Sequence, residues 1–376
     1  MKIVLVGLTY PFRGGISHYT TLLFKELQKV HPVKLITLRK QFPDLLFPGK
    51  TQKDGSSERI EVENDPVIHP LQPWTWFRAF SKIRANCPDL VLFQWWHPYF
   101  APSFGTLALL LKRWTRGNIC FLCHNVRPHD TSFIDTLLLK YAFSAPDRFI
   151  VHSEEDLRNL KALKAGAIVM KTPHPIYEVF KSQTTGGYEE ARKRLGIDGN
   201  VLLFFGYVRR YKGLEYLIEA FPKVTKEIPC SLLIVGEIYQ DREKVLRLIE
   251  QSPAKDHIRL IDEYVPNERV GLYFEAADLV VLPYLSATQS GIIQIAYGFN
   301  KPVVSTRVGG LPEVVVDGQT GFLADPESAD SLAESILRFF KEREKIDFWR
   351  NIEEVKEQFS WKRLVEVIER IHGGEA

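Results

Sequence analysis

Short, uninterrupted runs of apolar residues constrain the fold of this chain more than any other feature. Residues 3–6 and 90–93 are continuous apolar stretches. Such runs suit strands that are buried on both faces, and strands of this kind belong to parallel sheets. Between them lie segments with helical periodicity, for example residues 17–29, where apolar side chains recur at Tyr19, Leu22, Leu23 and Leu27. The alternation predicts an α/β fold with doubly wound sheets.

The same alternation appears in both halves of the chain. In the first half we expect strands at 2–7, 33–38, 89–95, 118–124, 148–152 and 167–170. In the second half we expect strands at 200–206, 230–236, 258–262, 278–283, 302–305 and 321–324, and helices at 213–227, 241–250, 267–276, 290–299, 328–341 and 361–371. Because 376 residues exceed one ordinary domain, the pattern predicts two Rossmann-like domains.

Domain boundaries follow from the polar, glycine-rich stretch within residues 175–195. We expect a first domain at 1–178 that binds the acceptor and a second at 190–358 that binds the donor. Residues 359–376 are expected to form a C-terminal helix that could cross back toward the first domain.

Charge and cysteine content exclude some classes of function. The net charge of +3 gives no argument for nucleic-acid binding. Cys120 and Cys123 form a CxxC, but residues three apart in a strand point to opposite faces, so we expect buried thiols and no metal site. No apolar run approaches the roughly 20 residues that span a bilayer, and the first segment resembles a strand rather than a signal peptide. These features favour a reduced, cytoplasmic protein.

The clearest candidate for a binding site is the basic turn Arg209-Arg210-Tyr211-Lys212-Gly213. It lies between an expected strand and an expected helix, where ligands bind in doubly wound sheets. A helix N-terminus already favours anions through its dipole and its free N–H groups, and Arg and Lys add charge-assisted hydrogen bonds. The turn therefore predicts a phosphate site, with a solvated basic turn as the simpler alternative.

Other strand ends in the chain also carry glycines or polar residues. Gly14 and Gly15 follow the first strand without forming GxGxxG, so the dinucleotide fingerprint of nicotinamide enzymes is missing. His124 and Asn125 end the strand expected at 118–124, with His129 close behind. Gly206 and Gly236 end strands in the second half, where residues 283–291 form a small, polar, hydroxyl-rich loop that can offer N–H groups to phosphate or sugar oxygens.

Taken in order, these segments resemble the family-4 retaining glycosyltransferases (glycosyl transferases group 1), which have the GT-B fold. The resemblance spans nearly the whole chain and implies two Rossmann-like domains whose parallel sheets face each other across a cleft. It rests on Gly14-Gly15-Ile16, His124-Asn125, the block from Phe205 to Gly213, Gly309-Gly310-Leu311-Pro312-Glu313, and the segment from Asp317 to Leu323.

The resemblance implies roles for individual residues. It assigns Arg209 and Lys212 to the diphosphate of a nucleotide-sugar and His124 to the reacting sugar. In the family an Arg directly follows the strand-end Gly, whereas here that position is Tyr207 and the role passes to Arg209. Further donor contacts are expected from Gly14, Gly15, Gly206, Gly236, Tyr264, Val265, Thr288, Gln289, Ser290, Gly291 and Gln294.

One departure from the family pattern concerns two glutamates that the family carries around the start of the helix expected at 290–299. The corresponding positions are Ala287 and Ile295. A double displacement would need a carboxylate nucleophile, so the expected route is attack by the acceptor on the face from which the diphosphate leaves. No cofactor or metal is expected, because the cations of the turn supply the positive charge.

Aromatic residues concentrate between Trp74 and Trp114. Aromatic side chains stack on sugars and seat at membrane interfaces, and they also form ordinary cores. On the acceptor side we expect Trp95, Trp96, His97, Asn125 and His129. Since Lys112, Arg113 and Arg116 are neighbours in sequence, a lipid-linked acceptor at the inner face of the membrane is a reasonable hypothesis.

The activity expected from these features is transfer of a hexose-type sugar from a UDP- or GDP-linked donor to a glycan or lipid-linked acceptor. Two alternatives stay open. A sugar-nucleotide epimerase would bind the same donor on the same architecture, and the missing glutamates also fit a catalytically weak sugar-nucleotide-binding protein.

Overall fold

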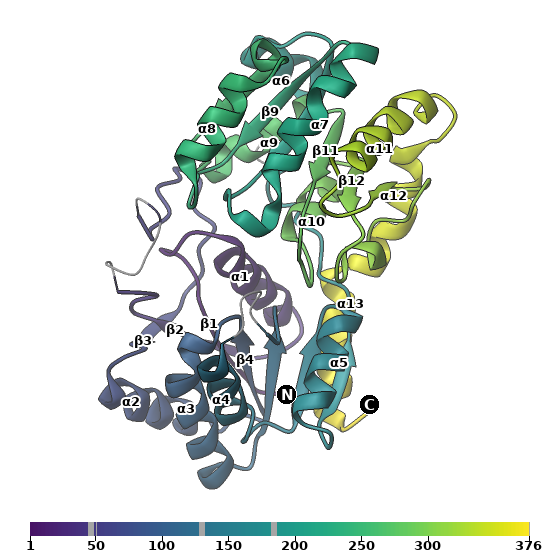
Figure 1. Cartoon of the computed structure of the whole chain (residues 1–376). Helices are drawn as coiled ribbons and strands as arrows, with labels where there is room; N and C mark the ends of the chain where they lie inside the picture. The colour runs from purple at the N-terminus through teal and green to yellow at the C-terminus, as the bar shows by residue number, and fades with distance from the viewer. Residues whose placement is uncertain (44–48, 50, 128–131, 182–185, 376) are drawn as a thin grey trace. The chain divides into compact units, whose positions relative to one another are not determined.

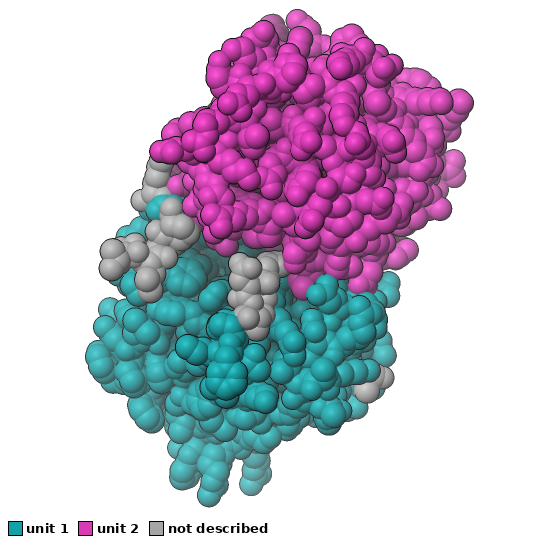
Figure 2. Space-filling view, in the orientation of Figure 1, with its two compact units in different colours: residues 1–54, 59–173, 360–376 teal, residues 55–58, 174–359 magenta. Residues whose placement is uncertain are grey.

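The computed structural model describes residues 1–43, 49, 51–127, 132–181 and 186–375. The chain forms two compact units, drawn in teal and magenta in Figure 2. Unit 1 comprises residues 1–54, 59–173 and 360–376, and unit 2 comprises 55–58 and 174–359. The last helix, α13 (Trp361–Gly373), thus belongs to unit 1, where the Tyr19 and Trp361 rings lie 5.1 Å apart.

Unit 1 is built on a seven-stranded sheet in the order β3-β2-β1-β4-β5-β6-β7, and every pair in it is parallel. Helices cover the sheet (Figure 1), and the core forms where their apolar stripes meet its buried side chains. The strands are β1 Ile3–Gly7, β2 Val33–Leu38, β3 Asp65–Ile68, β4 Leu90–Trp95, β5 Asn118–Cys123, β6 Arg148–Val151 and β7 Ile168–Lys171. The helices are α1 Gly15–Gln28, α2 Pro73–Ala85, η2 Pro98–Phe100, α3 Ala101–Trp114, α4 Phe133–Ala142, α5 Glu154–Leu163 and α13.

Unit 2 has a six-stranded parallel sheet in the order β10-β9-β8-β11-β12-β13. Its strands are β8 Asn200–Phe205, β9 Cys230–Val235, β10 Ile258–Ile261, β11 Leu279–Leu282, β12 Val303–Thr306 and β13 Gly321–Ala324. Its helices include α6 Gly187–Leu195, η3 Arg210–Lys212, α7 Leu214–Glu227, α8 Arg242–Gln251, α9 Asn267–Ala276, α10 Gly291–Gly298, α11 Ala329–Glu342 and α12 Phe348–Lys356. The predicted α/β class with two parallel sheets is confirmed.

The strand β3 is the one strand of the described chain that the apolar pattern did not predict. It carries Pro66, which cannot donate a ladder hydrogen bond and argues against a strand. In the structure β3 lies at the edge of its sheet, beside β2 alone, where a strand tolerates proline because one side needs no partner. No helix in the described part of the chain is long and apolar enough to cross a bilayer.

Candidate functional site

The basic turn of unit 2 lies where the strand order of its sheet reverses. The chain runs outward from β8 through β9 to β10 and then returns to the other side of β8 with β11. The loops after β8 and β11 therefore leave the sheet beside each other, and ligands of doubly wound sheets bind at such a switch point. These two loops are residues 206–213, which contain η3, and residues 283–290, which lead into α10.

Two glycines let the backbone of this site come unusually close together. Gly206 has φ 99° and Gly236 has φ 144°, in a region that side chains other than glycine rarely adopt. A Cβ on Gly236 would lie 2.2 Å from the carbonyl oxygen of Gly206, and a Cβ on Gly206 would lie 3.0 Å from Nζ of Lys212. Gly236 thus needs glycine for its backbone angle and its packing, and Gly206 needs it for its backbone angle, whatever the two positions bind.

Lys212 is a buried cation with no carboxylate beside it. The residue is 7% exposed, and among the described residues it forms no ion pair. Its Nζ lies 5.4 Å from the centre of the Tyr284 ring. Burial, with a contribution from Arg209, lowers the pKa of Lys212 to about 7. A buried charge without a partner is costly, so this arrangement is typical of a site that binds an anion.

The two arginines of the turn differ in what they contact. The exposed Arg209 lies over the ring of Tyr239 at 5.2 Å and has no carboxylate partner within the described chain. Arg210 binds Asp241 through two parallel hydrogen bonds of 2.5 and 2.8 Å. The pairing also lowers the pKa of Asp241. Arg210 is therefore engaged by its neighbour, which leaves Arg209 and Lys212 to meet an anion.

The N-terminus of α10 has no side-chain cap. Ser290 occupies the capping position without accepting a backbone hydrogen bond, and its hydroxyl interacts with Tyr284 instead. Four N–H groups at a helix start have no partner within the helix. The side-chain oxygens of Gln289 and Gln294 are buried without a hydrogen-bond partner in the described structure, and Gln294 is 1% exposed. The N–H groups of the helix start can donate hydrogen bonds to a polar ligand, and the two amide oxygens can accept hydrogen bonds from one.

The remaining residues of unit 2 that the sequence predicts to contact the donor vary in accessibility. Thr288 is buried within the loop, whereas Tyr264 is half-buried after β10. Val265 is a buried core residue, so it can offer a ligand only its backbone. Ala287 and Ile295 are buried and apolar, so no carboxylate replaces the two family glutamates at these positions.

Sequence analysis missed a buried carboxyl in this region, Glu237. It follows Gly236 directly and is 4% exposed, and its carbonyl oxygen accepts a hydrogen bond from the Val208 amide at 3.0 Å. That bond ties the loop after β9 to the loop after β8. The strand-end position was the available signal, because polar residues immediately after strands belong to the ligand-binding edge.

In unit 1, His124 lies at the end of β5 inside a buried polar cluster. Its Nε2 is 2.7 Å from Oε1 of Gln94, and because an amide oxygen only accepts, the proton of this bond sits on Nε2. The Tyr19 ring meets His124 edge-on at 4.4 Å. The Tyr19 hydroxyl is 3.1 Å from Nε2 of His152, whose pKa burial lowers to about 4. Sequence reasoning missed Gln94, Tyr19 and His152.

The other residues of unit 1 that were predicted to belong to the site differ in backbone conformation, packing and burial. Gly14 has φ 105° and precedes α1, which has no side-chain cap, so this helix start resembles that of α10. A Cβ on Gly15 would meet nothing within 4 Å, so packing does not require glycine there. Asn125 is half-buried, and His129 lies outside the described residues.

The structure corrects the expectation for Trp95. We expected it on the acceptor side, but it is the last residue of β4, is fully buried, and stacks on Phe121 at 6.0 Å. The strand ends at Trp95, as expected, but the last residue of this central strand still points into the core. Trp96 is half-buried against Phe100 at 4.4 Å, and His97 is exposed and caps η2.

Metal ligands do not gather within the described residues: no group of three His, Cys, Asp or Glu side chains there could hold an ion. Cys120 and Cys123 are both fully buried in β5, as their spacing predicted. Burial raises the pKa of each thiol well above its usual range, so neither is poised to act as a thiolate.

Comparison with known proteins gives one consistent result. Residues 199–342 match the family model described as Glycosyl transferases group 1. The uncharacterized glycosyltransferase MJ1178 of Methanocaldococcus jannaschii is 25% identical, over 99% of this chain and 98% of its own. D-inositol 3-phosphate glycosyltransferase of Corynebacterium diphtheriae is 28% identical over 61% of this chain and 56% of its own. The match to the solved structure of Anabaena HepE in complex with UDP extends over 100% of both chains, with a TM-score of 0.76 and 17% sequence identity.

Proposed function

Because the chain belongs to the group 1 glycosyltransferases and has their GT-B fold, we propose that it transfers a hexose-type sugar from a UDP-linked donor to a glycan or lipid-linked acceptor with retained anomeric configuration. The observation that carries the proposal is the position of Lys212, a buried cation without a carboxylate partner, at the switch point of the sheet. The other loop at this switch point leads into α10, whose N-terminus has no side-chain cap. A nucleoside diphosphate supplies the anion that such a site lacks. UDP is favoured over GDP because HepE binds it.

The proposed chemistry uses charge rather than a protein nucleophile. When the bond between the anomeric carbon and the diphosphate breaks, negative charge develops on the leaving oxygen. Arg209, Lys212 and the start of α10 stabilise that charge from fixed positions, and groups fixed in this way lose little energy to reorganisation. Ala287 and Ile295 offer no carboxylate for a covalent intermediate, so the acceptor hydroxyl attacks on the face that the diphosphate leaves. His124, held by Gln94, contacts the sugar in this proposal.

The experiment that tests the reaction is proton NMR of a UDP-sugar incubated with the protein, alone and with candidate acceptors. We expect release of UDP, slow with water and faster with an acceptor, and an anomeric coupling in the product that matches the donor. An epimerised sugar still attached to UDP would instead support the epimerase. Binding of UDP-sugar without any turnover would support the catalytically weak alternative.

An exposed apolar surface of unit 1 supports the lipid-linked acceptor. Helices α2, α3 and α4 lie side by side (Figure 1) and leave large apolar side chains exposed: Trp74, Phe77, Leu109, Trp114, Phe133, Ile134 and Leu137. These helices carry six Lys or Arg and one acid, Asp135. Aromatic and aliphatic side chains among basic residues suit the interface of an anionic bilayer.

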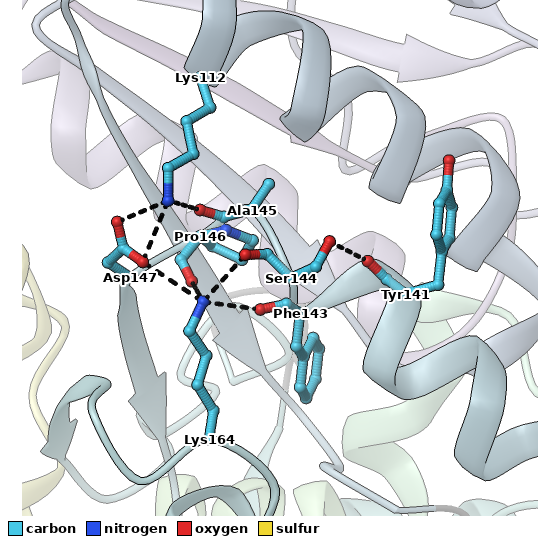
Figure 3. A network of polar contacts seen from close by, with 8 residues as sticks. All are labelled: Lys112, Tyr141, Phe143, Ser144, Ala145, Pro146, Asp147 and Lys164. Atoms are coloured by element: carbon cyan, nitrogen blue, oxygen red, sulfur yellow. Dashed lines mark hydrogen bonds and ion pairs between the residues drawn. The ribbon is translucent and has the colours of Figure 1, made fainter.

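Lys112 cannot be counted among the free cations of this surface. Its Nζ donates to Asp147 at 3.0 Å and to the Ala145 carbonyl at 2.9 Å, contacts that are drawn as dashed lines in Figure 3. Lys164 converges on the same turn through the carbonyls of Phe143, Ser144 and Pro146. The two lysines thus hold the segment before β6. Arg78, Arg84, Arg113 and Lys140 form no ion pair within the described residues and would meet the lipid phosphates.

The double variant Trp74→Ala/Phe77→Ala is expected to bind vesicles containing anionic lipid about 100-fold more weakly, since each large apolar side chain contributes on the order of 1.5 kcal/mol when buried and about 1.4 kcal/mol corresponds to a factor of ten. Co-sedimentation with phosphatidylglycerol vesicles measures this. The matched control is Trp349→Ala, which removes an indole of similar exposure (60% against 67%) from unit 2. Equal loss in both variants, or no vesicle binding by the wild type, would argue against a membrane role for this surface.

A further inference from the structure

A pocket of unit 2 lies away from the loops assigned to the donor. Its volume is about 540 Å³, within the range of ordinary ligand sites, roughly 300–1,000 Å³. Residues 277–278 and 300–302 line it and directly precede β11 and β12. The other wall is residues 343–349, which form the turn between α11 and α12 and the start of α12. The pocket thus opens at the amino ends of strands, whereas the loops of the donor site follow carboxyl ends.

Hydrogen bonds hold both walls of this pocket in place. In the wall beside the strands, the Asp278 carboxylate accepts a hydrogen bond from the Val201 amide at 2.7 Å. In the opposite wall, the amides of Lys345 and Ile346 both donate to the Glu342 carbonyl, at 2.8 and 3.0 Å. The turn between α11 and α12 is therefore an ordered wall, and the pocket is a built feature of unit 2.

Charge in this pocket is balanced, unlike the charge of the donor site. The lining contains three carboxylates and three cations: Asp278, Glu344, Asp347, Lys301, Arg343 and Lys345. An anionic ligand would meet the carboxylates and a cationic ligand would meet the lysines and the arginine, so neither gains from the overall charge. A neutral ligand that both donates and accepts hydrogen bonds can use the two kinds of group at once.

An exposed indole lines the pocket together with polar side chains that solvent can reach. Glu344 and Lys345 are exposed and Arg343 is half-buried, and Trp349, in the first turn of α12, is 60% exposed. The neighbouring Phe348 is buried in the core of unit 2, so α12 does not depend on the Trp349 ring for its packing. One exposed apolar side chain is ordinary on a protein surface. An aromatic face beside hydrogen-bonding groups in a pocket, however, suits a ligand that has both an apolar face and hydroxyl groups.

We propose that this pocket binds a neutral stretch of a glycan chain, with a sugar ring stacked on Trp349 and its hydroxyl groups bonded to Arg343, Glu344 and Lys345. Each sugar hydroxyl donates and accepts hydrogen bonds, as the mixed lining requires. The strands β11 and β12 have four residues each, so about 13 Å of sheet separates this pocket from the edge that carries the donor loops. A glycan bound here is therefore held by the protein and does not react at this place. Holding the chain raises the effective concentration of its other segments near the enzyme.

The test measures glycan binding without any need for turnover. The probes are maltohexaose, cellohexaose and mannohexaose, with the hexamer of galacturonic acid as an anionic comparison. The difference in tryptophan fluorescence between the wild type and Trp349→Phe reports on the indole in the pocket, and calorimetry gives the affinity. We expect at least one neutral probe to change this fluorescence in a saturable way and to bind more tightly than the anionic hexamer. Trp349→Ala should weaken that probe about tenfold, and Lys345→Ala about 3- to 10-fold.

Two control variants separate glycan binding at this pocket from the proposed sugar transfer. Trp74→Ala removes an indole of similar exposure from unit 1 (67% against 60%) and should leave the affinity for the glycan unchanged. Lys212→Ala, which tests the donor site, should also bind the glycan as the wild type does. If no neutral hexasaccharide binds, if the anionic hexamer binds more tightly, or if Trp349→Ala retains full affinity, the pocket assignment is wrong. Failure of the wild type to bind UDP contradicts the proposed function instead and leaves this test intact.

Discussion

Replacing Lys212 with alanine should lower kcat/KM for the UDP-sugar by about 10²- to 10³-fold, the usual loss when one fixed electrostatic contact to a developing anion is removed. The effect is large because Lys212 is buried and water cannot easily replace its charge near the diphosphate. Release of UDP, followed at several donor concentrations, measures the change. We expect both kcat and donor affinity to fall, since the diphosphate is charged before and during bond breaking.

A neighbouring arginine provides the matched control. Arg210→Ala removes a cation two residues away, but that cation is already paired with Asp241, so kcat/KM should change less than about threefold, as is typical of surface ion pairs. The loss of kcat/KM in Arg209→Ala should lie between those of Arg210→Ala and Lys212→Ala, because Arg209 is exposed and its charge is screened by solvent. Equal losses of kcat/KM in Arg210→Ala and Lys212→Ala would mean that general surface charge, rather than one buried cation, attracts the donor.

Replacing Gly236 with alanine should destabilise the protein by about 3 kcal/mol or more, the sum of backbone strain and a steric clash. Its φ of 144° disfavours any side chain, and the new Cβ would lie 2.2 Å from the Gly206 carbonyl oxygen, a backbone atom that cannot turn aside. Urea denaturation followed by circular dichroism measures the loss. UDP should also bind more weakly to whatever protein remains folded.

Gly166→Ala is the control for the glycine experiment. A Cβ at that position would meet nothing within 4 Å, so we expect a change within about 0.5 kcal/mol, as for ordinary surface substitutions. If Gly236→Ala unfolds at the same urea concentration as the wild type, the close approach of the loops after β8 and β9 is not a feature of the folded protein.

The sequence predicted most of the fold because parallel strands buried on both faces leave continuous apolar runs. Such runs located β1, β4 and β8 to within a residue or so. The edge strand β3 was not predicted, because an edge strand can carry a proline such as Pro66 and need not be apolar on both sides. Trp95 was misplaced for a related reason, since the last residue of a central strand is still in the core.

The candidate site could be predicted only as a set of strand-end segments. The basic turn could be predicted because three cations follow a strand. The sequence does not show that Lys212 is buried, or that Arg210 forms an ion pair with Asp241, thirty-one residues away. The pairing of Gln94 with His124 joins two strands that are neighbours only in the folded sheet.

The central claim is that the turn at Arg209 to Gly213 binds the diphosphate of a nucleotide-sugar. The most direct measurement is a thermal-shift panel of UDP, GDP and ADP and their sugars on the full-length protein. We expect UDP and its sugars to raise the melting temperature in a concentration-dependent manner and this shift to disappear in Lys212→Ala. If no nucleotide in the panel stabilises the wild type, or if Lys212→Ala responds as the wild type does, the claim is wrong.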